Sequence, residues 1–250
     1  MHILLTNDDG ISAPGLLALR QALASLGKIT VVAPSRNYSA AGHRKTMHKP
    51  LRIDETQLSD GARAWVCSGA PSDCVALALL GFVKEKIDVV VSGINPHANL
   101  GQDVTYSGTV TAALEAVIAG VPGIAVSTEA GSPPDYAPTV QIAARIVQTA
   151  AQKGLPPNTL LNVNVPPQIK GGFRITRQGL RIYRDELVER LDPRGRPYYW
   201  IGGEWPSGVV EEGTDFWAME HGYISITPLQ LDLTAYKAMP ALEKWFESEQ

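Results

Sequence analysis

Mainly apolar runs alternate with amphipathic stretches along the first two-thirds of this 250-residue chain. Residues 2–7 and 28–33 form two such runs, and the segment 14–26 between them carries leucines at helical spacing before Gly27. Continuous apolar strands separated by helices are typical of a parallel sheet that is covered on both faces. The start of the chain therefore predicts a β-loop-α unit of an α/β fold.

The same alternation continues to residue 165. We expect a doubly wound, mostly parallel sheet, Rossmann-like and three-layered. Ligands bind beyond the carboxyl ends of the strands in such sheets, so the loops 34–45 and 92–109 should converge on Asp8. The pattern predicts extended stretches at 46–53 and 64–67, helices starting near Pro71 and Ser107 and covering 138–151, and strands at 87–91, 123–127 and 159–165.

Beyond residue 165 the pattern changes to short β-like pieces with basic and aromatic residues. They predict a β-hairpin extension and, near residues 234–246, a terminal helix. We expect one domain over 1–250, with a core sheet in 1–165 and an extended oligomerisation segment in 166–250. Aromatic side chains of the extension either cover the core or, as we favour, pack against another subunit: Tyr183, Tyr198, Tyr199, Trp200 and Trp205.

The composition narrows the class of protein and the partners to be expected. Apolar residues make up 44% and charged residues 19% of the chain, as in folded globular proteins. The net charge of −3 gives no general attraction to nucleic-acid polymers or acidic membranes, so neither is an expected partner. We expect no export leader or spanning helix. Cys67 and Cys74 form no Cys-x-x-Cys pattern, which favours buried, reduced thiols and a cytoplasmic protein.

Two adjacent carboxylates, Asp8 and Asp9, directly follow the first predicted strand. Like charges held together raise one another's pKa, and a hard cation such as Mg²⁺ or Mn²⁺ removes that cost. The alternative is that one aspartate caps the following turn while the other is solvated. Ser39 and Asn95 follow other strands at the same sheet edge, and their neutral oxygens would complete a set of hard-cation ligands.

A Ser-Gly-Thr turn at Ser107, Gly108 and Thr109 leads into a helix rich in small residues. Free N–H groups at a helix start, with hydroxyls beside them, favour a bound phosphate. An ordinary N-cap at this position is the alternative interpretation.

Together these motifs closely resemble the SurE family of stationary-phase survival proteins. The resemblance implies a metal-dependent 5'-nucleotidase that removes phosphate from nucleoside 5'- and 3'-monophosphates, with short polyphosphate a further substrate in some members. It also implies homodimers or homotetramers that exchange C-terminal parts. The motifs span nearly the whole chain: Asn7-Asp8-Asp9-Gly10, Ser39 after Pro34, Gly69-Ala70-Pro71-Ser72-Asp73-Cys74-Val75, Ser92-Gly93-Ile94-Asn95, Asp103-Val104, Tyr106-Ser107-Gly108-Thr109-Val110 and Thr214-Asp215.

The resemblance also implies roles for single residues. Asp8, Asp9, Ser39 and Asn95 would bind one divalent cation per subunit, Mg²⁺ or Mn²⁺. Asn95, Ser107, Gly108 and Thr109 would lie near the phosphate. In the mechanism we expect, Asp8 and Asp9 are catalytic: Asp8 anchors the cation and Asp9 orients or deprotonates the attacking water.

Two positions depart from the pattern of many relatives, which have glycine in place of Ala40 and of His97. The His97 imidazole either touches substrate or metal, or is a solvated loop residue. His43, in another site loop, is open to the same two interpretations.

Rival functions also place aspartates after a first strand. A phospho-receiver module needs an acceptor aspartate after a later central strand, where this chain has the segment 92–95. A nucleoside hydrolase usually has further spaced carboxylates, which are missing after Gly10. A covalent aspartyl-phosphate route usually uses a spaced Asp-x-Asp pair, also absent here. We therefore expect direct hydrolysis of a phosphate monoester.

Overall fold

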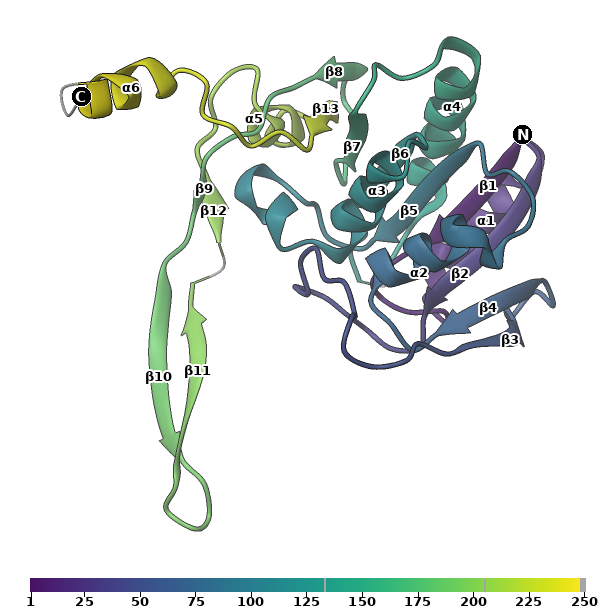
Figure 1. Ribbon diagram of the computed structural model, residues 1–250, viewed down its shortest axis with the longest axis horizontal. Helices are drawn as coiled ribbons and strands as arrows, with labels where there is room; N and C mark the ends of the chain where they lie inside the picture. The colour runs from purple at the N-terminus through teal and green to yellow at the C-terminus, as the bar shows by residue number, and fades with distance from the viewer. Residues whose placement is uncertain (133, 205, 248–250) are drawn as a thin grey trace.

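The computed structural model describes residues 1–132, 134–204 and 206–247 of the chain. Within these ranges the main sheet has nine strands (Figure 1). Their order across the sheet is β3 (Ile53–Gln57), β4 (Arg63–Cys67), β2 (Lys28–Pro34), β1 (His2–Thr6), β5 (Val89–Asn95), β6 (Gly123–Thr128), β7 (Thr159–Val165), β13 (Ile224–Gln230) and β8 (Phe173–Ile175). All neighbouring pairs are parallel except β3 with β4 and β13 with β7.

Helices cover both faces of this sheet, as the alternation of strands and helices predicts. On one face, residues of α1 (Pro14–Leu23) and α4 (Ala137–Lys153) form one apolar cluster with Ile3 and Leu5 of β1. On the other face, Leu4 of β1 packs with α2 (Pro71–Leu77) and α3 (Gly108–Ile118). Successive residues of a strand point to opposite faces, so an apolar β1 serves both layers at once. The predicted three-layer α/β fold is confirmed.

The structure corrects several predicted boundaries. The sheet continues past residue 165, because β13 returns antiparallel to β7 and then pairs with β8. Such a non-local pairing leaves no βα alternation in the sequence. Strand β5 runs to Asn95, so part of the predicted loop is strand, and a 3₁₀ helix, η2 (Gly101–Thr105), occupies more of it. Helix α2 continues as a π-helical turn, η1 (Ala78–Phe82). Gly81, near the end of this turn, has a left-handed φ of +117°.

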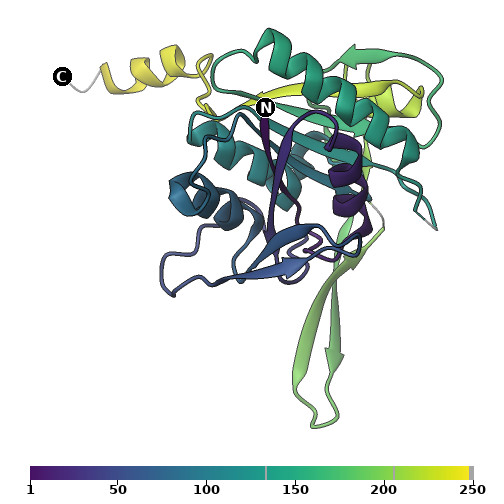
Figure 2. The same cartoon turned by 90° about the vertical axis from the view of Figure 1, so that its right-hand side faces the viewer.

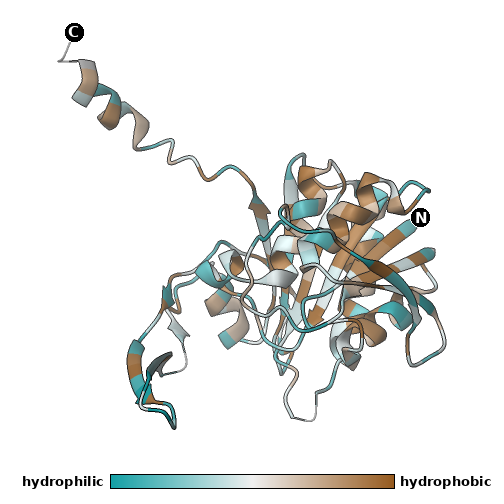
Figure 3. Ribbon diagram, turned by 60° about the horizontal axis from the view of Figure 1, so that its bottom comes forward, coloured by the Kyte–Doolittle hydropathy of each residue, from teal (hydrophilic) through white to brown (hydrophobic). Residues whose placement is uncertain are grey.

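A two-stranded arm extends far from the body of the molecule (Figures 1 and 2). It consists of β10 (Asp185–Leu191) and β11 (Pro197–Gly203), and its base is the short pair β9 (Arg181–Ile182) and β12 (Ser207–Gly208). After α5 (Asp215–Glu220) and β13, the terminal helix α6 (Met239–Glu247) also lies apart from the sheet (Figure 3). The predicted hairpin and terminal helix are therefore present.

Several large apolar side chains of this extension are exposed. Trp200 is 61% exposed and Phe246 66% exposed, which leaves apolar surface uncovered on both the arm and α6. Tyr183, Tyr198 and Tyr199 are exposed as well, and Trp205 lies outside the described residues. Tyr183, Tyr198, Tyr199 and Trp200 are therefore not part of the buried core. None of the described helices combines the length and the hydropathy that a membrane span requires.

Candidate active site

The turn after β1 is shaped by Asn7 and Gly10. The Asn7 side chain donates to the Gly10 carbonyl at 3.0 Å and accepts from the Gly10 N–H at 3.2 Å. Gly10 has φ +102°, and a Cβ there would lie 3.2 Å from the backbone carbon of Arg36. The two residues thus close a tight turn whose middle positions are Asp8 and Asp9.

Asp8 is buried against the start of α3. Thr109 Oγ1 donates to its Oδ1 at 2.5 Å, and a Cβ on Gly108 would lie only 2.6 Å from the Asp8 Cβ. Burial raises the pKa of Asp8, while the Thr109 hydroxyl and the N–H groups of Thr109 and Gly108 act in the opposite direction. The positive end of the α3 dipole also faces this carboxylate and offsets part of the cost of burial, but the net effect is a raised pKa.

Asp9 is more open than Asp8 and is strongly affected by its neighbours. Burial first, and then the Asp8 charge, raise the pKa of Asp9 from its ordinary value to about 6, while His97 lowers it. Asn37 donates to Asp9 Oδ1 at 3.3 Å. The predicted charge conflict between the two aspartates therefore exists in the structure, and it acts mainly on Asp9.

The loop after β2 brings Ser39 to the acidic pair. The Tyr38 N–H donates to the Asp8 carbonyl at 2.7 Å, and the Ser39 N–H donates to Asn37 Oδ1 at 2.6 Å. Asn37 thus bridges Ser39 and Asp9, a role that the sequence did not indicate. The following Ala40 has φ +56°, a conformation that favours glycine.

Asn95 ends β5, the immediate neighbour of β1 in the sheet, so it lies at the same sheet edge as the aspartates. Its amide donates to the His97 carbonyl at 2.6 Å rather than to either aspartate. The His97 side chain is 78% exposed and lies 3.8 Å from Glu129, and its charge acts on Asp9. His97 is thus an exposed loop residue that lies close enough to Asp9 to lower the pKa of that carboxyl group.

The hydroxyls at the start of α3 are already engaged within the protein. Ser107 is the N-cap and accepts from the Val110 N–H at 3.1 Å, while Thr109 is bonded to Asp8. A phosphate beside Asp8 would therefore meet the positive end of α3 more than free hydroxyl groups. The N-cap interpretation and the anion-site interpretation of this turn are compatible.

A buried charged residue that the sequence analysis missed, Glu115, holds the Ser39 loop against α3. Its carboxylate accepts from His43 Nε2 at 2.9 Å and from Lys45 at 3.0 Å, and both partners come from that loop. The His43 hydrogen bond is the main reason that the pKa of Glu115 lies below its ordinary value. Glu115 is the one charged residue of α3, a signal by which it could have been found.

The oxygen donors at this edge suit a hard cation. No three His, Cys, Asp or Glu side chains in the described ranges are grouped closely enough to hold a metal on their own. The acidic pair would therefore need neutral oxygens, such as those of Ser39 and Asn95, to complete a shell. A cation would also relieve the repulsion that raises the pKa of Asp9, so the residues present fit a divalent cation.

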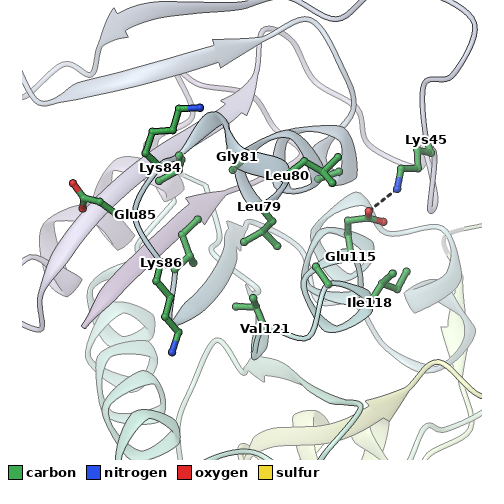
Figure 4. A pocket seen from close by; sticks show the side chains of 15 residues that line it. Lys45, Leu79, Leu80, Gly81, Lys84, Glu85, Lys86, Glu115, Ile118 and Val121 are labelled. Atoms are coloured by element: carbon green, nitrogen blue, oxygen red, sulfur yellow. Dashed lines mark hydrogen bonds and ion pairs between the residues drawn. The ribbon is translucent and has the colours of Figure 1, made fainter.

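A separate hollow of about 780 Å³ lies between η1 and α3, away from the acidic pair. Leu79, Leu80 and Ile118 are apolar side chains that line it, and so do both members of the Lys45–Glu115 ion pair (Figure 4). None of the predicted site residues lines this hollow.

Comparison with known proteins places this arrangement in a family. The family model described as Survival protein SurE matches residues 3–185. The chain belongs to the SurE family. This confirms the resemblance drawn from the motifs that carry Asp8, Asn95 and Ser107.

SurE relatives match nearly the whole chain. A protein of Chloroflexus aggregans named 5'-nucleotidase SurE is 51% identical over 250 residues, covering 98% of this chain and 99% of that protein. One of the same name from Herpetosiphon aurantiacus is 54% identical over 239 residues, covering 94% of each. The crystal structure of the SurE protein from Aquifex aeolicus is 41% identical, with a TM-score of 0.82 over 98% of this chain and 99% of that chain.

Proposed function

We propose that this chain is a 5'-nucleotidase that hydrolyses nucleoside 5'-monophosphates to a nucleoside and inorganic phosphate. The assignment rests on relatives named 5'-nucleotidase SurE that are about half identical over nearly the whole chain. The observation that carries the site is the buried Asp8 at the positive start of α3, with Asp9 beside it. Nucleoside 3'-monophosphates and short polyphosphate are further proposed substrates.

We propose that Asp8, Asp9, Ser39 and Asn95 hold one divalent cation per subunit, Mg²⁺ or Mn²⁺. When bound, such an ion supplies Lewis-acid stabilisation of the negative charge on the phosphoryl group and lowers the pKa of water. The all-oxygen donor set and the strained charge pair support this proposal.

The chain's own residues have distinct proposed tasks. Asp8 is fixed by Thr109 and serves as the immobile carboxylate of the site. Asp9 is more exposed than Asp8, and its carboxylate orients or deprotonates the attacking water. The start of α3 at Ser107, Gly108 and Thr109, together with Asn95, faces the phosphate and stabilises its oxygens.

The rival functions gain no support from these observations. A phospho-receiver needs an acceptor aspartate at the end of a central strand, but β5 ends in Ser92-Gly93-Ile94-Asn95. A nucleoside hydrolase would also use aspartates and a cation, and it differs in the bond that it breaks.

One assay of AMP separates the two hydrolases. The chelated enzyme is resupplied with Mn²⁺, and released phosphate is measured colorimetrically while adenosine and adenine are separated by chromatography. We expect phosphate and adenosine in equal amounts. Free adenine without phosphate would contradict the proposal.

We also propose that the chain forms a homodimer or homotetramer through residues 166–250. The exposed apolar side chains of the arm and of α6 support this proposal. A cytoplasmic location is proposed as well, because Cys67 and Cys74 are both buried, free thiols, which suits a reducing compartment.

A further inference from the structure

The segment from Asn99 to Tyr106, here termed the lead-in segment, runs directly into the Ser107 turn of the site. It contains the 3₁₀ helix η2 and belongs to none of the sheets formed by the described residues. Its backbone polar groups therefore need partners from elsewhere in the fold. Those partners decide where the start of α3 lies.

One side of the lead-in segment is fixed to the core sheet. The Asn99 N–H donates to Asn164 Oδ1 at 2.8 Å, and the side chains of Asn162 and Asn164 donate to the Asn99 carbonyl at 2.9 and 3.1 Å. The Asn99 side chain donates to Ser127 at 2.7 Å. These buried amides anchor the beginning of the segment to β6 and β7.

The other side is fixed to the base of the arm by Asp215, which is fully buried. Its carboxylate accepts from the N–H groups of Gly101 at 2.8 Å, Gly179 at 2.8 Å and Phe216 at 2.9 Å. A Cβ on Gly101 would lie 2.6 Å from the Gly179 carbonyl oxygen, so the two backbones touch. This packing joins three segments that are far apart in the sequence.

A second, more exposed layer of contacts lies next to Ser107. Asp103 accepts from the Tyr183 hydroxyl at 2.6 Å and pairs with Arg181 at 2.7 Å. The Arg181 N–H also donates to the Gln102 side chain at 2.6 Å. Arg181 begins β9, and Tyr183 lies two residues before the first strand of the arm, so the root of the arm is bonded to η2.

The Asp103 backbone carbonyl links these side-chain contacts to the turn at Ser107. Its carbonyl accepts from the N–H groups of Tyr106 and Ser107, both at 3.0 Å. The residue that receives Tyr183 and Arg181 on its side chain thus also closes the turn that holds Ser107.

We propose that Asp103 is a positioning residue for the phosphate turn, and that Tyr183 and Arg181 at the root of the arm set its place. The inference rests on the phosphate role proposed for residues 107–109. Tyr183 is 39% exposed, so its contact with Asp103 contributes little to the core while it orients a turn next to the site. Affinity for phosphate therefore depends on a contact supplied by the arm-bearing segment.

The test is the Tyr183→Phe variant of the full chain, which removes one hydroxyl. A matched control is Tyr236→Phe, because Tyr236 also donates to an aspartate, Asp232, but far from the site. KM for AMP, kcat and the inhibition constant of inorganic phosphate are measured with Mn²⁺. Amide hydrogen exchange of 101–109, melting temperature and light scattering are followed in parallel.

We expect Tyr183→Phe to raise KM and the phosphate inhibition constant about fivefold, which corresponds to one ordinary hydrogen bond. The kcat should stay within about twofold, exchange of 101–109 should become faster, and the control should match the unaltered chain. Asp103→Asn, which also loses the Arg181 ion pair, should change KM in the same direction and by more.

Unchanged KM and inhibition constant in Tyr183→Phe would overturn the proposal, whether or not the melting temperature falls. A loss of assembly that accompanies the weaker affinity would also overturn it, because the role is placed within one chain. Ser107→Ala separates the two claims. If it weakens phosphate binding while Tyr183→Phe does not, the phosphate role stands and the positioning role fails; if neither variant does, both fail.

Discussion

A substitution at Gly108 is the sharpest test of how α3 packs against Asp8. The Gly108→Ala variant adds one Cβ, which would lie 2.6 Å from the Asp8 Cβ and 3.0 Å from Oδ2. Carbon atoms in contact normally stay about 3.5–4.0 Å apart, so about 1 Å of movement is required. Asp8 cannot turn aside easily, because Thr109 holds its Oδ1 at 2.5 Å. The strain must therefore displace Asp8 or the start of α3.

This overlap should lower both the free energy of unfolding and the rate of the reaction. Overpacking of this kind costs about 1–3 kcal/mol of unfolding free energy, so the fold should survive. A displacement of about 1 Å at the reacting groups costs of the order of 100-fold in rate. We therefore expect Gly108→Ala to lose about 100-fold in kcat/KM while its melting temperature falls by only a few degrees.

Phosphate release from AMP in the presence of Mn²⁺ measures kcat/KM, and thermal unfolding of the same samples measures the melting temperature. The control is Gly172→Ala, because Gly172 has no atom within 4 Å of an added Cβ and does not have a left-handed φ. It should retain both activity and stability. Full activity in Gly108→Ala, with an unchanged melting temperature, would refute the contact between α3 and Asp8.

Two further predictions concern pH and the Ser39 loop. Because the pKa of Asp9 is raised to about 6 in the metal-free fold, stability arising from this group falls as pH rises from its ordinary value near 3.8 through about 6. A cation removes that loss, so the rise in melting temperature on adding Mn²⁺ should be smaller at pH 5 than at pH 7.5; equal rises would contradict the assignment of Asp9 as a ligand. Glu115→Gln should raise the KM for AMP and lower the melting temperature by a few degrees, because His43 and Lys45 lose a charged partner; an unchanged KM in steady-state assays would show that Glu115 has no influence on the site.

Local patterns were enough to predict the central part of the fold. The apolar runs of β1 and β2 are buried on both faces, and their shared sheet edge places the Ser39 loop beside Asp8. Strand ends at one edge of a parallel sheet converge whatever their spacing in the chain. Membership of the SurE family agrees with the motifs at these strand ends.

The sequence was less informative where a contact joins distant segments through one side chain. Asp215 appeared only as part of a motif, yet its carboxylate binds backbone N–H groups of residues 101 and 179. The β7–β13 pairing is antiparallel and spans some sixty residues, so no periodicity reports it. Glu115 was overlooked because its helix otherwise consists of small and apolar residues, which predict burial rather than an ion pair.

The most direct test of the central claim is metal-restored hydrolysis of AMP by the chelated chain and by its Asp8→Asn and Asp9→Asn variants. We predict that Mn²⁺ or Mg²⁺ restores phosphate release in the unaltered chain and that both variants remain folded but nearly inactive. Full activity of the chelated chain without added metal, or of both variants with it, would contradict an acidic pair that acts through a divalent cation.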